Sequence, residues 1–213
     1  MKTKTDYEFA YWTKRKSIEG MLKNGHYEHF YTTHFDLKKN YYNNKKILDI
    51  GCGPRGSLEW AEMADQRIGI DPLADAYLKI GAVHHGMQYI AGRSEDMPFS
   101  KNYFDVVCSF NSLDHVDDLE KTIHEIFRII KPGGLLLLLT DVNHKPTHCE
   151  PISFSFDIVK KFMPPLTLLK LNHYEKKAGG MYESILANIA YDHHDKTDRY
   201  GILSAKFMRN GEN

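Results

Sequence analysis

The feature that most constrains the fold is the stretch KKILDIGCGPRGSLEW at residues 45–60. Its apolar run, residues 47–50, predicts a buried strand. Three glycines follow at Gly51, Gly53 and Gly56, and glycine allows both the positive φ of a tight turn and the close approach of a ligand to bare backbone. Residues 57–60 are expected to open a helix whose first amides could face that ligand. The stretch therefore predicts the opening unit of a nucleotide-binding α/β sheet.

Strand and helix patterns alternate after this unit. Expected strands cover residues 46–50, 67–71, 87–92, 104–110 and 134–140, and expected helices begin at 57 and cover 74–80 and 119–130. This alternation predicts a parallel, doubly wound sheet with helices on both faces. Beyond it we expect a helix at 154–163, an alternating run at 166–175 and a closing strand at 201–207, whereas the pattern assigns no structure to 180–198.

The first 44 residues are rich in aromatic side chains and lack a strand pattern. Their periodicity predicts two helices, at about residues 7–22 and 26–37. We expect them to form a helical cap, so that the chain divides into a cap at 1–44 and a core at 45–213.

Charge and cysteine content limit the possible partners. The chain has 28 Lys and Arg against 28 Asp and Glu, so it carries no general electrostatic footprint for nucleic acid or for an anionic membrane. Its longest apolar run, residues 135–139, is too short to cross a bilayer. The first residues contain no apolar signal stretch, and the three cysteines are scattered. We therefore expect a cytoplasmic protein.

Two carboxylates narrow the choice of ligand. Asp49 stands two residues before the first glycine, where dinucleotide folds normally have an apolar residue. A carboxylate there would repel a pyrophosphate and hold a cationic amino or sulfonium group. Asp71 lies twenty residues past Gly51 and can accept hydrogen bonds from ribose hydroxyls. Both ligand families use the ribose contact, so Asp49 is the residue that discriminates between them.

Four segments of the sequence occur in the order of the motifs of a known enzyme family. They are ILDIGCGPRG, GIDP, residues 92–116 and residues 125–139, and together they resemble the motifs of the class I S-adenosylmethionine-dependent methyltransferases. The resemblance covers about residues 45 to 140. It implies a mostly parallel, seven-stranded-type Rossmann-like sheet, S-adenosylmethionine as methyl donor and S-adenosylhomocysteine as product.

The resemblance also implies roles for individual residues. It implies that the methionine part of the cofactor is bordered by Asp49, Gly51, Cys52 and Gly53, and that its far end is lined by Phe110, Asn111 and His115. Asp71 would bind the ribose hydroxyls. The adenine would be contacted by Pro72, Leu73, Ser94 and Glu95. Two positions depart from the family. Arg93 replaces a frequent acid, which moves the adenine amino contact to Glu95. The sequence NSLD after the fourth strand argues against the amino methylases that act on adenine bases or glutamine.

Methyl transfer from a sulfonium is an in-line displacement, so positioning and water exclusion supply most of the rate. A base is needed only if the acceptor holds its proton at neutral pH. The candidates are Asp114 and His115 after the fourth strand and His144 after the fifth, with His148 and Glu150 beside it. The alternatives are a helix-start role for His115 and solvated loop roles for His144 and His148.

Two further expectations concern a cofactor contact from the cap and the possibility of a metal site. We expect Arg15 or Tyr31 to touch the carboxylate of the cofactor. The histidine-rich segments 26–34 and 144–149 lack the spacing of a known closed metal site, so we predict no metal.

The aromatic cap favours a small-molecule or metabolite acceptor. Two rivals stay open, a peptide or protein methyltransferase that uses residues 179–200 and a catalytically silent S-adenosylmethionine-binding partner subunit. A dehydrogenase is disfavoured by Asp49 and by the block at 92–139.

Overall fold

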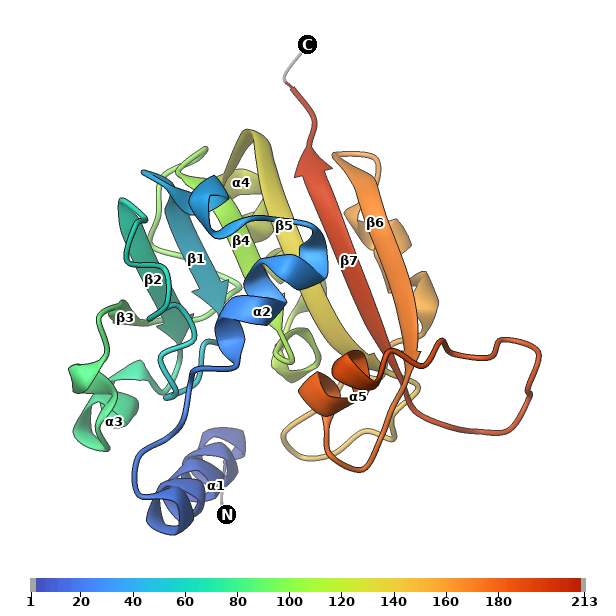
Figure 1. Cartoon of the computed structure of the whole chain (residues 1–213), viewed down its shortest axis with the longest axis horizontal. Coiled ribbons are helices and arrows are strands. Elements are labelled where there is room, and N and C mark those ends of the chain that lie inside the picture. The colour runs from blue at the N-terminus through green and yellow to red at the C-terminus, as the bar shows by residue number, and fades with distance from the viewer. Residues whose placement is uncertain (1–2, 212–213) are drawn as a thin grey trace.

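The computed structural model describes residues 3–211 as one seven-stranded sheet with the strand order β3-β2-β1-β4-β5-β7-β6 (Figure 1). The strands are β1 Lys46–Ile50, β2 Gln66–Asp71, β3 Gln88–Ala91, β4 Phe104–Phe110, β5 Ile130–Val142, β6 Leu166–Glu175 and β7 Gly201–Arg209. Neighbouring strands from β3 to β5 pair in parallel, and β7 runs antiparallel to both β5 and β6. The predicted fold class is thus confirmed.

Helices lie on both faces and at one edge of this sheet (Figure 1). They are α1 Lys4–Glu19, α2 Tyr27–Tyr31, α3 Ala74–Lys79, α4 Leu119–Ile129 and α5 Met181–Ala187. No helix of the described chain is long and apolar enough to cross a membrane.

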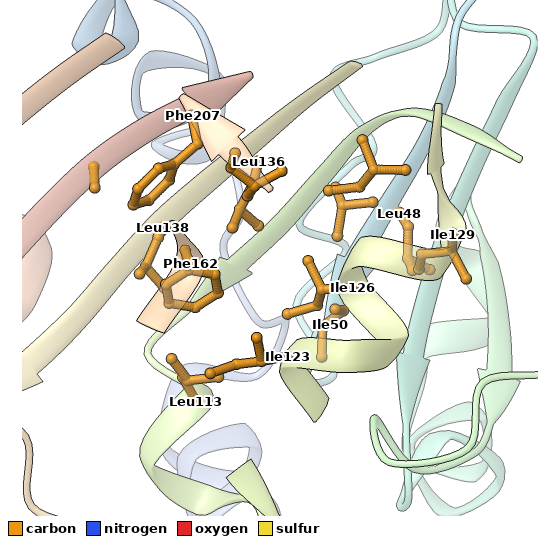
Figure 2. Packing of buried hydrophobic residues seen from close by; sticks show 14 of the residues in the cluster. Leu48, Ile50, Leu113, Ile123, Ile126, Ile129, Leu136, Leu138, Phe162 and Phe207 are labelled. Atoms are coloured by element: carbon orange, nitrogen blue, oxygen red, sulfur yellow. The ribbon is translucent and has the colours of Figure 1, made fainter. Parts of the chain in front are cut away.

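The leucine run of β5 explains how one strand serves two apolar layers. Successive side chains of a strand point to opposite faces. Leu136 and Leu138 therefore join one cluster, and the alternate residues Leu135, Leu137 and Leu139 join the other. Figure 2 shows the first cluster, in which α4 packs its isoleucines toward the strands. A strand covered on both faces needs a continuous apolar run, as this one has.

The helix expected from residue 57 does not form. Residues 56–64 instead make successive tight turns, in which Glu59 N–H bonds the carbonyl of Gly56 and Ala61 N–H that of Leu58. Leu58 and Ala61 are fully buried, so tertiary packing fixes this segment in a compact non-helical path. The proposal that helix amides at this point face a ligand is therefore wrong.

Two other expected helices are shorter or tighter than the sequence pattern indicates. The stretch 26–37 gives the one-turn α2 and a 3-10 turn, Thr33–Phe35, because the hydroxyl of Thr32 bonds back to the carbonyl of Glu28 and helix geometry ends there. The stretch 154–163 gives a 3-10 helix, Phe156–Phe162, which ends ahead of two prolines.

The first helix begins earlier than predicted. Thr3 and Asp6 form a capping box at the start of α1, and Gly20, with φ of +70°, ends it. The unassigned region contains α5 and then a long connection into β7.

Candidate active site

A large pocket opens at the carboxyl ends of β1, β2 and β4, with α1 lying across these ends (Figure 1). Its volume is about 1570 Å³. Sites for one small ligand usually measure about 300–1,000 Å³, so this pocket is large enough to hold two small ligands. Its lining includes every proposed cofactor residue: Arg15, Tyr31, Asp49, Gly51, Cys52, Gly53, Asp71, Pro72, Leu73, Ser94, Glu95, Phe110, Asn111 and His115.

The glycine turn forms the floor of the pocket. Gly51 has φ of +68°, and a Cβ atom at this position would lie 2.3 Å from Cβ of Ser112. Gly53 has φ of +56°, and a Cβ there would meet the Trp12 ring at 3.4 Å. The positive φ favours glycine at both positions, and at Gly51 the close packing of Ser112, from the loop after β4, also requires it.

Asp49 is the second-last residue of β1 and carries a buried carboxylate. Its Oδ2 accepts hydrogen bonds from the Tyr31 hydroxyl at 2.9 Å and from the Ser57 hydroxyl. Its Oδ1 accepts none from the described residues. Burial raises the pKa of Asp49 to about 7, although both hydroxyls favour the ionised form. Such a site stabilises a cation or a hydrogen-bond donor brought by a ligand.

Asp71 is the last residue of the neighbouring strand β2, two residues past Gly69, the partner of Asp49 in the sheet. Its carboxylate accepts hydrogen bonds from the amides of Gly53, at 3.2 Å, and Leu73, at 2.9 Å. Burial raises the pKa of Asp71 to about 6 against these two bonds. The contact ties the glycine turn to β2 and leaves the carboxylate lining the pocket.

Glu95 lines the pocket, but its carboxylate already has partners. Oε1 accepts hydrogen bonds from the amides of Asp117, at 2.7 Å, and Asp118, at 3.2 Å. The hydroxyl of Ser94 lies 2.9 Å from that of Thr122. Arg93 pairs with Asp117. The bonds of Glu95 and Arg93 join the loop after β3 to the loop after β4. Oε1 of Glu95 is therefore already occupied within the chain.

Aromatic rings form one wall of the pocket. Phe110 ends β4, and its ring centroid lies 4.4 Å from that of Tyr31. Asn111 follows with φ of +53°, which turns the chain away from the strand. Cys52 is buried, and burial raises its pKa well above the usual range, which makes the thiol inert.

The two cap residues proposed to touch the cofactor carboxylate have partners within the chain. The Tyr31 hydroxyl is bonded to Asp49 and its side chain is buried. Arg15 forms an ion pair with Glu19, and its Nε has no partner among the described residues. Arg15 is the more available of the two for an anionic group.

The three proposed catalytic residues lie together. Nε2 of His115 is 3.9 Å from Oδ1 of Asp114 and 3.9 Å from Oε1 of Glu150, and Nε2 of His144 is 3.4 Å from Oδ2 of Asp114. His115 and Glu150 line the pocket, whereas Asp114 and His144 lie behind that wall. His148 is exposed and stacks on Tyr7.

Sequence reasoning missed several pocket residues, among them Glu8, Asp141 and Tyr182. Glu8 bonds Nε1 of Trp12 at 2.7 Å, and a Glu–Trp pair at i and i+4 on a helix was the available signal. Asp141 lies near the end of β5, as acids do on β1 and β2, and pairs with Lys176. Tyr182 belongs to α5, which no pattern assigned.

The chain is similar to a family model and to several known proteins. Residues 48–138 match a family model described as a methyltransferase domain. The chain is 34% identical over 137 residues to the ubiquinone/menaquinone biosynthesis C-methyltransferase UbiE of Vibrio cholerae serotype O1, covering 55% of this chain and 50% of UbiE. It is 30% identical over 136 residues to the sterol 24-C-methyltransferase erg6 of Aspergillus fumigatus, covering 57% and 35%. It thus spans half or less of these relatives' lengths.

A solved structure extends the likeness in fold. The N-methyltransferase NodS of Bradyrhizobium japonicum WM9, in complex with S-adenosyl-L-homocysteine, matches with a TM-score of 0.61 at 13% identity. The match covers 88% of this chain and 89% of NodS, so the common architecture extends beyond the segment that the family model matches.

Proposed function

We propose that this chain, which carries a domain of the class I S-adenosylmethionine-dependent methyltransferase family, transfers a methyl group to a small-molecule acceptor. The observation that carries the proposal is the pair of buried acids, Asp49 and Asp71, at the ends of adjacent strands around one glycine turn. Two acids there suit a ligand with ribose hydroxyls and a positive charge, and they disfavour a pyrophosphate.

The chain's own atoms fit this cofactor. Oδ1 of Asp49 is buried without a donor among the described residues, and a buried acceptor of this kind indicates a place for a ligand's donor or cation. Asp71 faces the pocket as a hydrogen-bond acceptor for hydroxyls. When bound, S-adenosylmethionine supplies the methyl group on a sulfonium and leaves as S-adenosylhomocysteine.

The residues around it exclude water and orient the reactants. The rings of Phe110 and Tyr31 form an apolar wall, and α1 closes the pocket on the side facing the glycine turn. Displacement at a methyl group depends mainly on such positioning.

We propose that residues 1–44 form the cap of a core at residues 45–213. We also propose that the protein is located in the cytoplasm.

His115 is the proposed proton acceptor. Burial lowers its pKa, and the carboxylates of Glu8 and Glu150 offset this only in part, so the ring is neutral near pH 7. Its Nε2 has no hydrogen-bond partner within residues 3–211. A neutral imidazole on the pocket wall can take the proton of an acceptor hydroxyl or amine. Oδ1 of Asp114 lies 3.9 Å from Nε2 of His115, beyond hydrogen-bond distance.

The test is transfer of a labelled methyl group from S-adenosylmethionine into metabolite and macromolecule fractions of a cell extract. We expect label in the metabolite fraction. Label only in macromolecules would favour the peptide or protein methyltransferase, and no label despite tight S-adenosylhomocysteine binding would favour the silent subunit.

A matched pair of variants tests the base. His115→Gln should lower transfer by about 10²–10⁴-fold while S-adenosylhomocysteine binding is retained. His124→Gln, an exposed histidine of α4, should leave transfer unchanged.

A further inference from the structure

Behind the pocket wall lies a cluster of three side chains from two loops. Asp114 belongs to the 3-10 turn Leu113–His115 after β4, and His144 and Glu150 belong to the loop after β5. Each offers one ligand atom, and the three atoms lie within 4.8 Å of one another. Parallel strands bring these loops together at one edge of the sheet, although the residues are far apart in sequence.

Three buried polar atoms of this cluster, two of Asp114 and one of His144, lack hydrogen-bond partners among the described residues. Asp114 is 1% exposed, yet neither of its oxygens accepts a hydrogen bond from any described residue. His144 is 5% exposed, and its Nε2 is also without a partner within the same range. Buried polar groups are rarely left in this state without a bound water or ion.

The hydrogen bond made by Nδ1 of His144 indicates which of its two ring nitrogens carries the proton. Nδ1 lies 3.2 Å from the carbonyl oxygen of Lys145, so Nδ1 carries the proton and donates it there. Nε2 then points its lone pair toward Oδ2 of Asp114, 3.4 Å away. Two acceptors facing each other inside a protein repel, whereas a cation between them would bind both. A histidine that donates its other N–H to a backbone carbonyl is the usual arrangement of a metal ligand.

We propose that Asp114, His144 and Glu150 bind a divalent transition metal ion of the series from Mn²⁺ to Zn²⁺. The imidazole favours these ions over Mg²⁺ and Ca²⁺, which prefer oxygen ligands alone. Ligands about 2.1 Å from one ion lie about 3–4.2 Å apart, so small side-chain rotations close the present spacing. Two carboxylates balance the charge of the ion.

The site is open toward the pocket. Glu150 lines the pocket and is about one-third exposed, which gives the ion an entry path and a free coordination position. Three protein ligands with one open position are typical of catalytic rather than structural metal sites. On the proposed function, an acceptor with a hydroxyl or carboxylate oxygen would bind at this position, beside His115.

The experiment is a titration of the full chain, stripped with a chelator and dialysed, with Co²⁺ followed by its visible absorption. We expect one ion per chain. Asp114→Asn, His144→Asn and Glu150→Gln should each weaken binding by more than about tenfold, which is the loss caused by removing even a supporting partner of a ligand. His148→Asn, an exposed histidine of the same loop, should bind as the wild type does.

Titration with S-adenosylhomocysteine in parallel separates the two proposals and reports folding. If it binds to every variant and Co²⁺ binding is absent or equal in all of them, the metal site is wrong and the proposed function stands. If Co²⁺ binds as expected and S-adenosylhomocysteine does not bind the wild type, the proposed function is wrong and the metal site stands. Glu150→Gln decides the case if the buried substitutions unfold the chain.

Discussion

The hydroxyl of Tyr31 donates a 2.9 Å hydrogen bond to Oδ2 of Asp49, which joins the N-terminal cap to the carboxyl end of the central strand β1. Both side chains are buried. Removal of one partner leaves a buried carboxylate with one donor fewer, at a cost of about 1–3 kcal/mol. Tyr31→Phe should lower the free energy of unfolding in urea by this amount. Tyr11→Phe, on a side chain that is 52% exposed, should have no measurable effect.

The stability of the ligand-free protein should decrease as pH rises from 5 to 8. A carboxyl of the unfolded chain titrates near pH 3.9, whereas burial raises the pKa of Asp49 to about 7 and that of Asp71 to about 6. Between these values the folded state binds more protons, so these groups lose their contribution as pH rises through 6 to 7. Melting temperatures from pH 5 to 8 should fall, and Asp49→Asn should reduce the slope. A slope equal to that of the exposed control Asp65→Asn would contradict this.

Affinity for S-adenosylhomocysteine should increase as pH rises, whereas stability decreases. Hydrogen bonds from ribose hydroxyls favour the ionised form of Asp71, and its pKa in the ligand-free site is about 6. Below pH 6 the dissociation constant should rise, by up to about tenfold per pH unit. Calorimetry at pH 5, 6, 7 and 8 measures this. A pH dependence that persists in Asp71→Asn would exclude Asp71 as its source.

The helix α1 should open more often when the ion pair between Arg55 and Glu19 is removed, although Lys4 and Lys16 also anchor it. Among the described residues α1 buries no side chain, and Arg55 holds it with two 2.8 Å bonds to Glu19. Arg55→Met should make trypsin cleave α1, at Lys14 or Lys16, about severalfold faster than in the wild type, because local opening needs less free energy. S-adenosylhomocysteine should slow the cleavage. Equal rates in Arg55→Met and in Lys79→Met, on an exposed lysine of α3, would show that the pair does not hold the helix.

The sheet was predictable because its strands have strong local patterns. The apolar run Leu135 to Leu139, directly after a proline and two glycines, is typical of a strand covered on both faces. The four blocks gave a resemblance that the family model confirms for residues 48–138. The missed features depend on tertiary packing. Residues 56–64 have the composition of a helix start, but burial of Leu58 and Ala61 holds them in turns.

The site was predictable where a residue ends a strand. Asp49 and Asp71 border one glycine turn because β1 and β2 pair in parallel and both acids stand near the carboxyl ends of these strands. Asp114 meets His144 because the loops that carry them follow the parallel strands β4 and β5. The partners of these residues were not predictable. That the Tyr31 hydroxyl would bond Asp49, and that the carboxylate of Glu95 would hold two loop amides, depends on loop paths that no periodicity encodes.

The central claim is that the acids around the glycine turn bind an adenosyl cofactor. Its most direct test is calorimetric titration of S-adenosylhomocysteine and of NAD into the wild type, Asp71→Asn and Asp75→Asn, the last an exposed acid of α3. We predict one site for S-adenosylhomocysteine in the wild type and in Asp75→Asn, binding more than about tenfold weaker in Asp71→Asn, since a lost hydrogen bond to a charged group costs about 1.5–3 kcal/mol, and no binding of NAD. Binding of NAD but not of S-adenosylhomocysteine would contradict the claim.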